Sequence, residues 1–421
     1  MNNLRRVSSL KKLRVPYVVS AIALTVVVGF LFLTPEGGIN RVSEPSNSSP
    51  AEFADDSFGE PTEPSSESVD AGLEYIETFT LTDRADGYGA RPEIASNGEY
   101  IYIVYLGDLT TQRSHKVRIY DLDFNLIGEK VLATGSPEYG GVTDIRISKD
   151  DNYVYSFYEM AGKKTGASLF GAKYRMDGSF TKVAESDGPI ATSAFFFDAV
   201  DGEETLNDPA SIVVNGKVYL MTQITYKRGG VRNAKTLYRL RELSSDLSEI
   251  VDSRDIDLSE AMTGWAGLAN LLEIGGAIYT IQGSLVSYPS GFSSDLRMVR
   301  FDADWGFDQD TDVFDLTNTE DTTETMPVGA RYVDGYLFVS FRVGDVTVAA
   351  PENPTSRGEL WLNMYDSNFE LIDSVQVSAD GVEGEHASVE VVGDYVYVAY
   401  GGSTSDAERE DVYVGVFRFR N

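Results

Sequence analysis

The segment VRIYDLDFNLI, residues 117–127, contains oxygen-bearing side chains at alternate positions: Asp121, Asp123 and Asn125. This spacing opens the calcium loop of an EF-hand, which also needs a glycine after the third ligand and a glutamate six residues later. Here leucine takes both places. The segment LNMYDSNFELI, residues 362–372, repeats the apolar positions but keeps a single carboxylate before its phenylalanine. We therefore interpret the phrase as a turn between two strands, in which carboxylates bond to backbone amides.

A richer acidic run falls at the corresponding point of another repeat. Its members are Asp302, Asp304, Asp308, Asp310 and Asp312. We interpret these residues as turn residues as well, and calcium binding at the acidic turns remains an open alternative. The chain has two histidines, so a multi-histidine metal site is excluded. No other metal and no cofactor is predicted.

Acid–base chemistry becomes available if the fold brings together a group of titratable residues that lie near the starts of strands. The catalytic candidates are Glu93, Asp144, Asp208, Glu385 and His386. A glycoside hydrolase uses two carboxyl groups facing a bound sugar, one of them kept protonated. The alternative is that these carboxylates neutralise Arg91, Arg146 and Arg331. No G-x-S-x-G, H-E-x-x-H or P-loop motif occurs.

Three segments, GDLTTQRSHK, EMAGKKTG and YKRGGVRNAK, contain eight basic residues against two acidic ones. The bases are Arg113, Lys116, Lys163, Lys164, Lys227, Arg228, Arg232 and Lys235. Residues 73–421 as a whole contain 57 acids and 29 bases, a net charge of −28. Such a surface repels nucleic acid and anionic membrane. The local excess of bases predicts a site for an anionic glycan or an acidic protein segment; ordinary solvated loops are the alternative.

The same order of signals recurs six times: a short strand, a Gly/Asn/Asp turn and an aromatic-rich strand. The turns begin near Gly98, Asp151, Gly216, Gly276, Gly335 and Gly393, at spacings of 53 to 65 residues. Two further strands follow each hairpin, and the DLDF phrase is the junction between them. Alternating apolar residues bounded by these turn residues predict antiparallel hairpins.

Four antiparallel strands in a repeat of this length are typical of β-propeller blades. The sixth repeat is one strand short, and residues 75–82, YIETFTLT, precede the first repeat with strand alternation. Adding this segment to the last blade would remove two open sheet edges. We predict an all-β, six-bladed β-propeller of four-stranded antiparallel blades over residues 73–421, closed by its N-terminal strand.

Three short segments are expected to precede the propeller. Residues 1–16 contain five bases and no acid, and residues 17–33 are uncharged. At 1.5 Å per residue the second segment spans roughly 26 Å, close to a hydrocarbon core, so we predict one transmembrane helix with a cytoplasmic N-terminus. Residues 34–72 form a disordered acidic Pro/Ser linker. The predicted location is the cell membrane, single-pass, with the C-terminal domain extracytoplasmic; a cleaved signal peptide is the alternative.

Two short stretches resemble known propellers. Arg91-Pro92-Glu93 resembles the Arg-Ile-Pro element of the sialidases, and residues 215–219, NGKVY, are similar to a turn of kelch-type repeats. The chain has no Asp box of the Ser-x-Asp-x-Gly-x-Thr-Trp kind and lacks the kelch Gly-Gly and Trp pattern. The resemblance implies a propeller architecture, from which no catalytic residue can be transferred.

In propellers generally the innermost strands start around a central funnel, so the residues that open each repeat are expected to converge there. The predicted ligand-binding residues are Arg91, Arg146, Lys163, Lys164, Lys227, Arg228, Arg232, Trp265 and Arg331. The leading functional prediction is a membrane-anchored module that binds a ligand or protein, such as an anionic glycan, on its funnel face. The alternative is a glycan-active hydrolase or lyase that uses the funnel carboxylates.

Overall fold

The computed structural model describes part of the compact unit Glu67–Asn421. The described residues are 71–82, 89–107, 113–162, 164–194, 202–225, 227–228, 231–232, 236–262, 269–288, 291–318, 322–345, 358–379, 382–404 and 411–420. The predicted basic segment, transmembrane helix and nearly all of the linker lie outside them. In these ranges we find no helix of the length and hydrophobicity that a membrane crossing requires.

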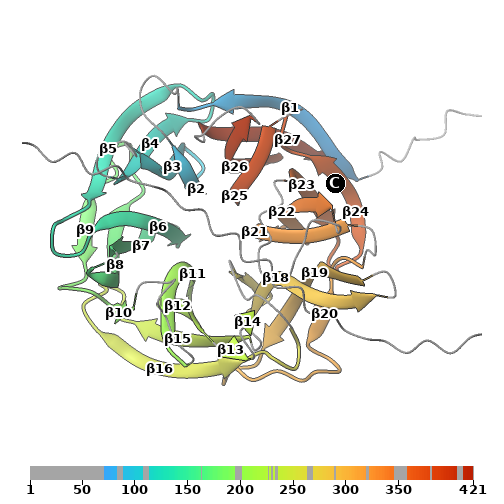
Figure 1. Ribbon diagram of the computed structural model, residues 1–421. Coiled ribbons are helices and arrows are strands. Elements are labelled where there is room, and N and C mark those ends of the chain that lie inside the picture. The colour runs from blue at the N-terminus through green and yellow to red at the C-terminus, as the bar shows by residue number, and fades with distance from the viewer. Residues whose placement is uncertain are drawn as a thin grey trace, which may run out of the picture. The chain divides into compact units, whose positions relative to one another are not determined.

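The described residues form six antiparallel sheets arranged as blades around a central axis (Figure 1). From the axis outward, the first three blades are β2 (Ala90–Ser96), β3 (Tyr100–Gly107), β4 (Ser114–Asp121) and β5 (Leu126–Thr134); β6 (Gly141–Lys149), β7 (Tyr153–Gly162), β8 (Gly166–Arg175) and β9 (Lys182–Glu185); and β11 (Glu204–Val214), β12 (Lys217–Ile224), β15 (Leu237–Leu243) and β16 (Ile250–Asp257). A short strand β10 (Ala191–Ser193) also pairs with β8, and β13 (Lys227–Arg228) and β14 (Val231–Arg232) form a separate hairpin.

The other three blades follow the same plan. They are β17 (Asn270–Ile274), β18 (Ala277–Tyr288), β19 (Gly291–Phe301) and β20 (Val313–Asp315); β21 (Thr322–Val333), β22 (Tyr336–Asp345), β23 (Glu359–Tyr365) and β24 (Leu371–Gln376); and β25 (Val382–Val392), β26 (Tyr395–Thr404), β27 (Asp411–Arg420) and β1 (Gly72–Thr80). The prediction of an all-β, six-bladed propeller with four-stranded antiparallel blades is confirmed.

The outer strand of the sixth blade comes from the start of the described chain. β1 pairs with β27 from Gly72 opposite Arg420 to Thr80 opposite Tyr413, and it runs along the rim of the ring (Figure 1). The amide of Leu73 also donates a 2.7 Å hydrogen bond to the Asp373 carboxylate of the fifth blade. Residues far apart in the sequence therefore share one sheet and one blade boundary.

The core consists of six apolar layers, one between each pair of adjacent blades. The layer between the first and sixth blades, for example, packs Ile101 and Ile103 against Val414 and Val416. Because both faces of a blade meet another blade, its two central strands are apolar on both faces and bury large side chains such as Tyr102 and Phe338. Apolar packing therefore continues around the whole ring.

The DLDF phrase forms the turn between the third and fourth strands of a blade, as predicted. The Asp121 carboxylate accepts hydrogen bonds from the amides of Asp123 and Asn125, and the Phe124 amide bonds to the Asp121 carbonyl. Phe124 has a φ of 58°, and its ring stacks on Phe79 at 4.3 Å. Corresponding turns place an apolar residue at positive φ in four other blades, and these residues are Phe180, Leu247, Trp305 and Phe369. The repeated phrase inserts an apolar side chain between neighbouring blades.

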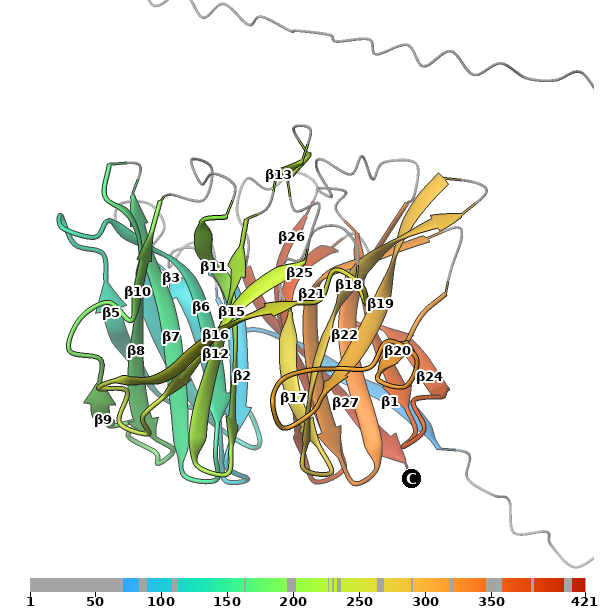
Figure 2. The ribbon, with the colours of Figure 1, turned by 90° about the horizontal axis from the view of Figure 1, so that it is seen from below.

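The two faces of the ring differ. Each inner strand starts at one face, which we call the funnel face, and ends in a tight hairpin turn at the other, which we call the turn face. The connections between second and third strands, including the β13–β14 hairpin, lie at the funnel face (the top of Figure 2). The three predicted basic segments connect such strands in the first three blades, so they share the funnel face with the starts of the inner strands.

Candidate functional site: the charged axis

The starts of the first three inner strands meet in one ion cluster. The Arg91 guanidinium lies 2.7 Å from the Asp144 carboxylate and 2.8 Å from that of Asp208. Arg91 and Asp208 have φ values of 50° and 52°, and both lie where strand register shifts. Bulges of this kind redirect side chains. We name Arg91, Asp144 and Asp208 the upper cluster.

A second arginine ties the same three blades together one step further along the axis. Arg146 Nη1 lies 2.7 Å from the Glu93 carboxylate, and its Nε donates to the Pro209 carbonyl at 2.9 Å. Burial outweighs the attraction of Arg146 and raises the pKa of Glu93 to about 7. Glu93 therefore changes protonation near neutral pH despite its arginine partner.

The pKa values of the two aspartates in the upper cluster are shifted in opposite directions. Burial opposes ionisation of Asp144, but Arg91 lies beside it and lowers its pKa below the usual value. Burial and the negative charge of Asp144 raise the pKa of Asp208. Paired carboxyl groups of this kind titrate as a unit, in which one ionises well before the other. At pH values where Asp144 is already ionised, Asp208 can still hold a proton.

Glu159, on β7, is a further buried carboxyl group at this end of the axis, and the sequence interpretation missed it. Its carboxylate accepts a 2.6 Å hydrogen bond from the Thr143 hydroxyl. Burial raises the pKa of Glu159 to about 7, and the nearby charge of Asp144 adds to the shift. A buried carboxyl group with a raised pKa beside a funnel is a candidate functional group.

His386 and Glu385 both lie on β25. His386 has a φ of 49°, and burial together with the charge of Arg91 lowers the pKa of its imidazole well below the usual value. The imidazole is therefore neutral at pH 7 and can accept a proton only in acid. The backbone of Glu385 pairs with Gly401, and its side chain lies outside the described atoms.

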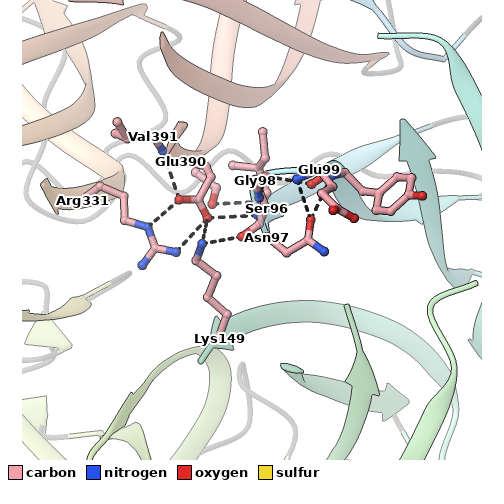
Figure 3. Close-up of polar contacts among 11 residues, drawn as sticks. Ser96, Asn97, Gly98, Glu99, Lys149, Arg331, Glu390 and Val391 are labelled. Carbon is pink, nitrogen blue, oxygen red and sulfur yellow. Dashed lines mark hydrogen bonds and ion pairs between the residues drawn. The ribbon is translucent and has the colours of Figure 1, made fainter. Parts of the chain in front are cut away.

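A separate network, which we call the lower network, surrounds Glu390 at the far end of the inner strands (Figure 3). The Glu390 carboxylate lies 2.9 Å from Arg331 Nη2 and 2.9 Å from Lys149 Nζ, and it accepts the Ser96 amide at 3.2 Å. These residues come from the fifth, sixth, second and first blades, so one carboxylate links four blades. Arg331 lies near the end of β21, beside Lys149 and Gly98 of the hairpin turns.

The other predicted ligand-binding residues are less fully described. Lys164 is exposed in the turn between β7 and β8. The backbones of Lys227, Arg228 and Arg232 form the β13–β14 hairpin, and their side chains are not described. Lys163 and Trp265 lie outside the described residues.

Glu159 and Glu390 carried a signal that sequence reasoning could have used. Glu390 stands between Val389 and Val391, and Glu159 follows the aromatic run YSFY. An ionisable residue inside an apolar strand of a propeller must find a partner or lie at the axis. Such residues should therefore be included among funnel candidates.

In the described ranges no three His, Asp or Glu side chains lie so that they could hold a metal ion. Asp302, in the acidic run, acts as a turn residue, because its carboxylate accepts hydrogen bonds from the amides of Asp304 and Gly306. Asp312 lies beside Arg300 and accepts the Asp308 amide.

Known proteins resemble this chain in structure alone. No family model and no curated protein sequence matches it. The parainfluenza virus 5 hemagglutinin-neuraminidase ectodomain has a TM-score of 0.50 and 11% identity, over 83% of this chain and 86% of that one. Trypanosoma rangeli sialidase in complex with sialic acid has a TM-score of 0.45 and 12% identity, over 82% and 57%. A GH43_1 enzyme from Xanthomonas citri complexed with xylotriose has a TM-score of 0.42 and 12% identity, over 81% and 89%.

The chain shares a propeller fold with the parainfluenza virus 5 ectodomain. At these identities the similarity concerns the fold, and the same fold carries many unrelated activities. Function has to be argued from the axis and the funnel face of this chain.

Proposed function

We propose that this protein is a membrane-tethered, extracytoplasmic binding module whose funnel face takes an anionic glycan. The observation that carries the proposal is the state of the predicted catalytic carboxylates. Glu93, Asp144 and Asp208 each lie within 2.8 Å of an arginine nitrogen. They hold the inner strands together, which leaves ligand contacts to the loops above them.

The charge of those loops supports an anionic ligand. The three basic segments contain eight bases and two acids, in a region of 57 acids and 29 bases. All three segments join the second and third strands of their blades, and the β13–β14 hairpin alone contains Lys227, Arg228 and Arg232. Electrostatic attraction at an exposed face is screened over about 8 Å at physiological salt, so binding should weaken as salt rises.

The test replaces Lys163, Lys164, Lys227 and Arg228 by Ser and measures retention on a polygalacturonate column at increasing salt. We expect retention to be lost and the melting temperature to stay unchanged. The matched control replaces four bases outside the basic segments whose side chains are at least 44% exposed, and they are Lys182, Lys217, Arg254 and Arg300. Equal retention of both variants would refute the proposal. Retention on a polyglutamate column but not on polygalacturonate would indicate an acidic protein segment instead.

A second candidate function is that of a glycan-active hydrolase or lyase. The difference in pKa between Asp144 and Asp208 favours it. A glycosidase needs one carboxyl group protonated and another ionised. In this alternative Asp208 is the proton donor and Asp144 the ionised partner. Turnover of a glycan panel by the full-length chain, lost in Asp208→Asn and kept in the four-base variant above, would establish the enzyme; no turnover by the parent protein would dismiss it.

A further inference from the structure

The axis contains a cavity of about 230 Å³. All six inner strands line it, and Glu93 and Arg146 belong to its wall, as do Lys149 and Arg331 of the lower network. Lys149 and Arg331 also line a depression at the turn face, beside Asn97. The cavity therefore lies below the upper cluster and approaches the surface at the turn face.

Two hydroxyl groups in the wall need a partner. Ser148 and Ser211 line the cavity from β6 and β11, and Ser211 is 7% exposed. Within the described part of the chain, the Oγ of each is buried without a hydrogen-bond partner. Buried polar atoms are nearly always satisfied by protein, water or ligand. The volume is large enough for about seven water molecules at ~30 Å³ each, or for a small organic molecule.

The charges in the wall favour an anion. Lys149 and Arg331 share the single carboxylate of Glu390, and Arg146 is matched by Glu93. The lower network of Lys149, Arg331 and Glu390 thus has one positive charge in excess. The cavity wall also contains Glu273, which is exposed and accepts the Gly276 amide within its own turn. The Nε and Nη2 of Arg331 bind Glu390, whereas in the described residues no hydrogen bond involves its Nη1. A donor and a charge thus remain available at this end of the cavity.

The rim at the turn face limits which anions can enter. Asp150 and Asp151 line the depression outside the cavity. The Asp150 carboxylate accepts the amides of Asn152 and Tyr153, which fixes it in its turn, and Asp151 is exposed. Negative charge at the entrance disfavours a polyanion more strongly than a monoanion. The entrance at the turn face should therefore disfavour the polyanions that the basic segments of the funnel face would attract.

We propose that the axial cavity binds a small monoanionic molecule with one carboxylate or oxyanion group, which enters from the turn face. Lys149 and Arg331 hold the anionic group, and the hydroxyls of Ser148 and Ser211 bind the remainder of the ligand. The site is independent of the proposed glycan site, because it uses other residues at the opposite end of the axis.

The experiment measures thermal unfolding of the full-length protein with increasing acetate or inorganic phosphate, at an ionic strength kept constant with sodium chloride. A ligand that binds only the folded state raises the melting temperature in a saturable way. We expect the melting temperature of the parent protein to rise in a saturable way with acetate. Ser211→Leu, which fills the cavity, should bind acetate with at least tenfold weaker apparent affinity. Ser253→Leu, at an exposed position on β16, should keep the parent's affinity. A rise with phosphate alone would assign the site to an inorganic oxyanion.

Lys149→Met provides a second test that keeps Glu390 paired with Arg331 and is needed if Ser211→Leu does not fold. We expect at least a tenfold loss of acetate affinity, with Lys182→Met as the matched control. The four-base funnel variant should bind acetate like the parent, so failure of one proposal is distinguishable from failure of the other. No saturable rise with either probe, or an acetate affinity in both cavity variants equal to the parent's, would refute the proposal.

Discussion

Replacing Glu159 by Gln should stabilise the protein in a pH-dependent way. Glu159 is 4% exposed, and its pKa rises from 4.5 to about 7 because burial disfavours the carboxylate. The folded state therefore binds more protons than the unfolded chain between these two values, and stability falls as the pH rises through this range. Gln keeps the shape and an oxygen that can accept the Thr143 hydroxyl, and it does not ionise.

The magnitude follows from the shift. A difference of this size corresponds to about 3 kcal/mol once the pH exceeds both values, at ~1.36 kcal/mol per unit. At pH 5 only about 1 kcal/mol of this penalty has developed. Glu159→Gln should thus exceed the parent's free energy of unfolding by about 3 kcal/mol at pH 8.5 and by about 1 kcal/mol at pH 5.

The assay is urea unfolding of both proteins at the two pH values, with Glu249→Gln as the control because Glu249 is exposed on the outside of the third blade. The control should not change stability with pH. A Glu159→Gln variant that is less stable than the parent by the same amount at both pH values would refute the reasoning. It would mean that ionised Glu159 is held favourably by Arg91.

Three further predictions concern the architecture and the anchor. Deleting residues 73–82 removes the outer strand of the sixth blade and should lower the melting temperature of the whole propeller; an unchanged melting temperature would contradict closure by this strand. Phe124→Ala, which removes a half-buried ring between the first and sixth blades, should destabilise by ~1–3 kcal/mol in urea unfolding, whereas Leu126→Ala, 55% exposed, should change stability little. The protein should fractionate with membranes and retain residues 1–16 in N-terminal sequencing; a mature N-terminus between Leu33 and Gly72 would indicate a cleaved signal instead.

The blade architecture could be predicted because its signals are local. A hairpin such as RPEIASNGEYIYIVY combines alternating apolar residues with Gly98, whose φ of 87° suits a turn that glycine adopts readily. The DLDF phrase could be interpreted as a turn for the same reason, since the bonds of Asp121 span only two and four residues. Six repetitions of these patterns at similar spacing left a propeller as the fold that pairs all of the strands.

The partners at the axis could be predicted only in part. Pairing of the axial carboxylates with arginines was considered from the sequence, and Arg91 indeed meets Asp144 and Asp208. The position of Arg331 was not foreseen, and neither were Glu390 and Lys149.

The sequence by itself determined the strands, their turns and the excess of bases in three loops, because each depends on residues close together in the chain. Tertiary structure decided the charge pairs of the axis. Arg91 and Asp208 are 117 residues apart, and Ser96 meets Glu390 across 294 residues. Bulges at Arg91, Asp208 and His386 change which face of the strand each side chain occupies, and a shift of one residue reverses that face. Only the packing of the blades around the axis sets these distances, and with them the pKa values of Asp144, Asp208 and Glu159.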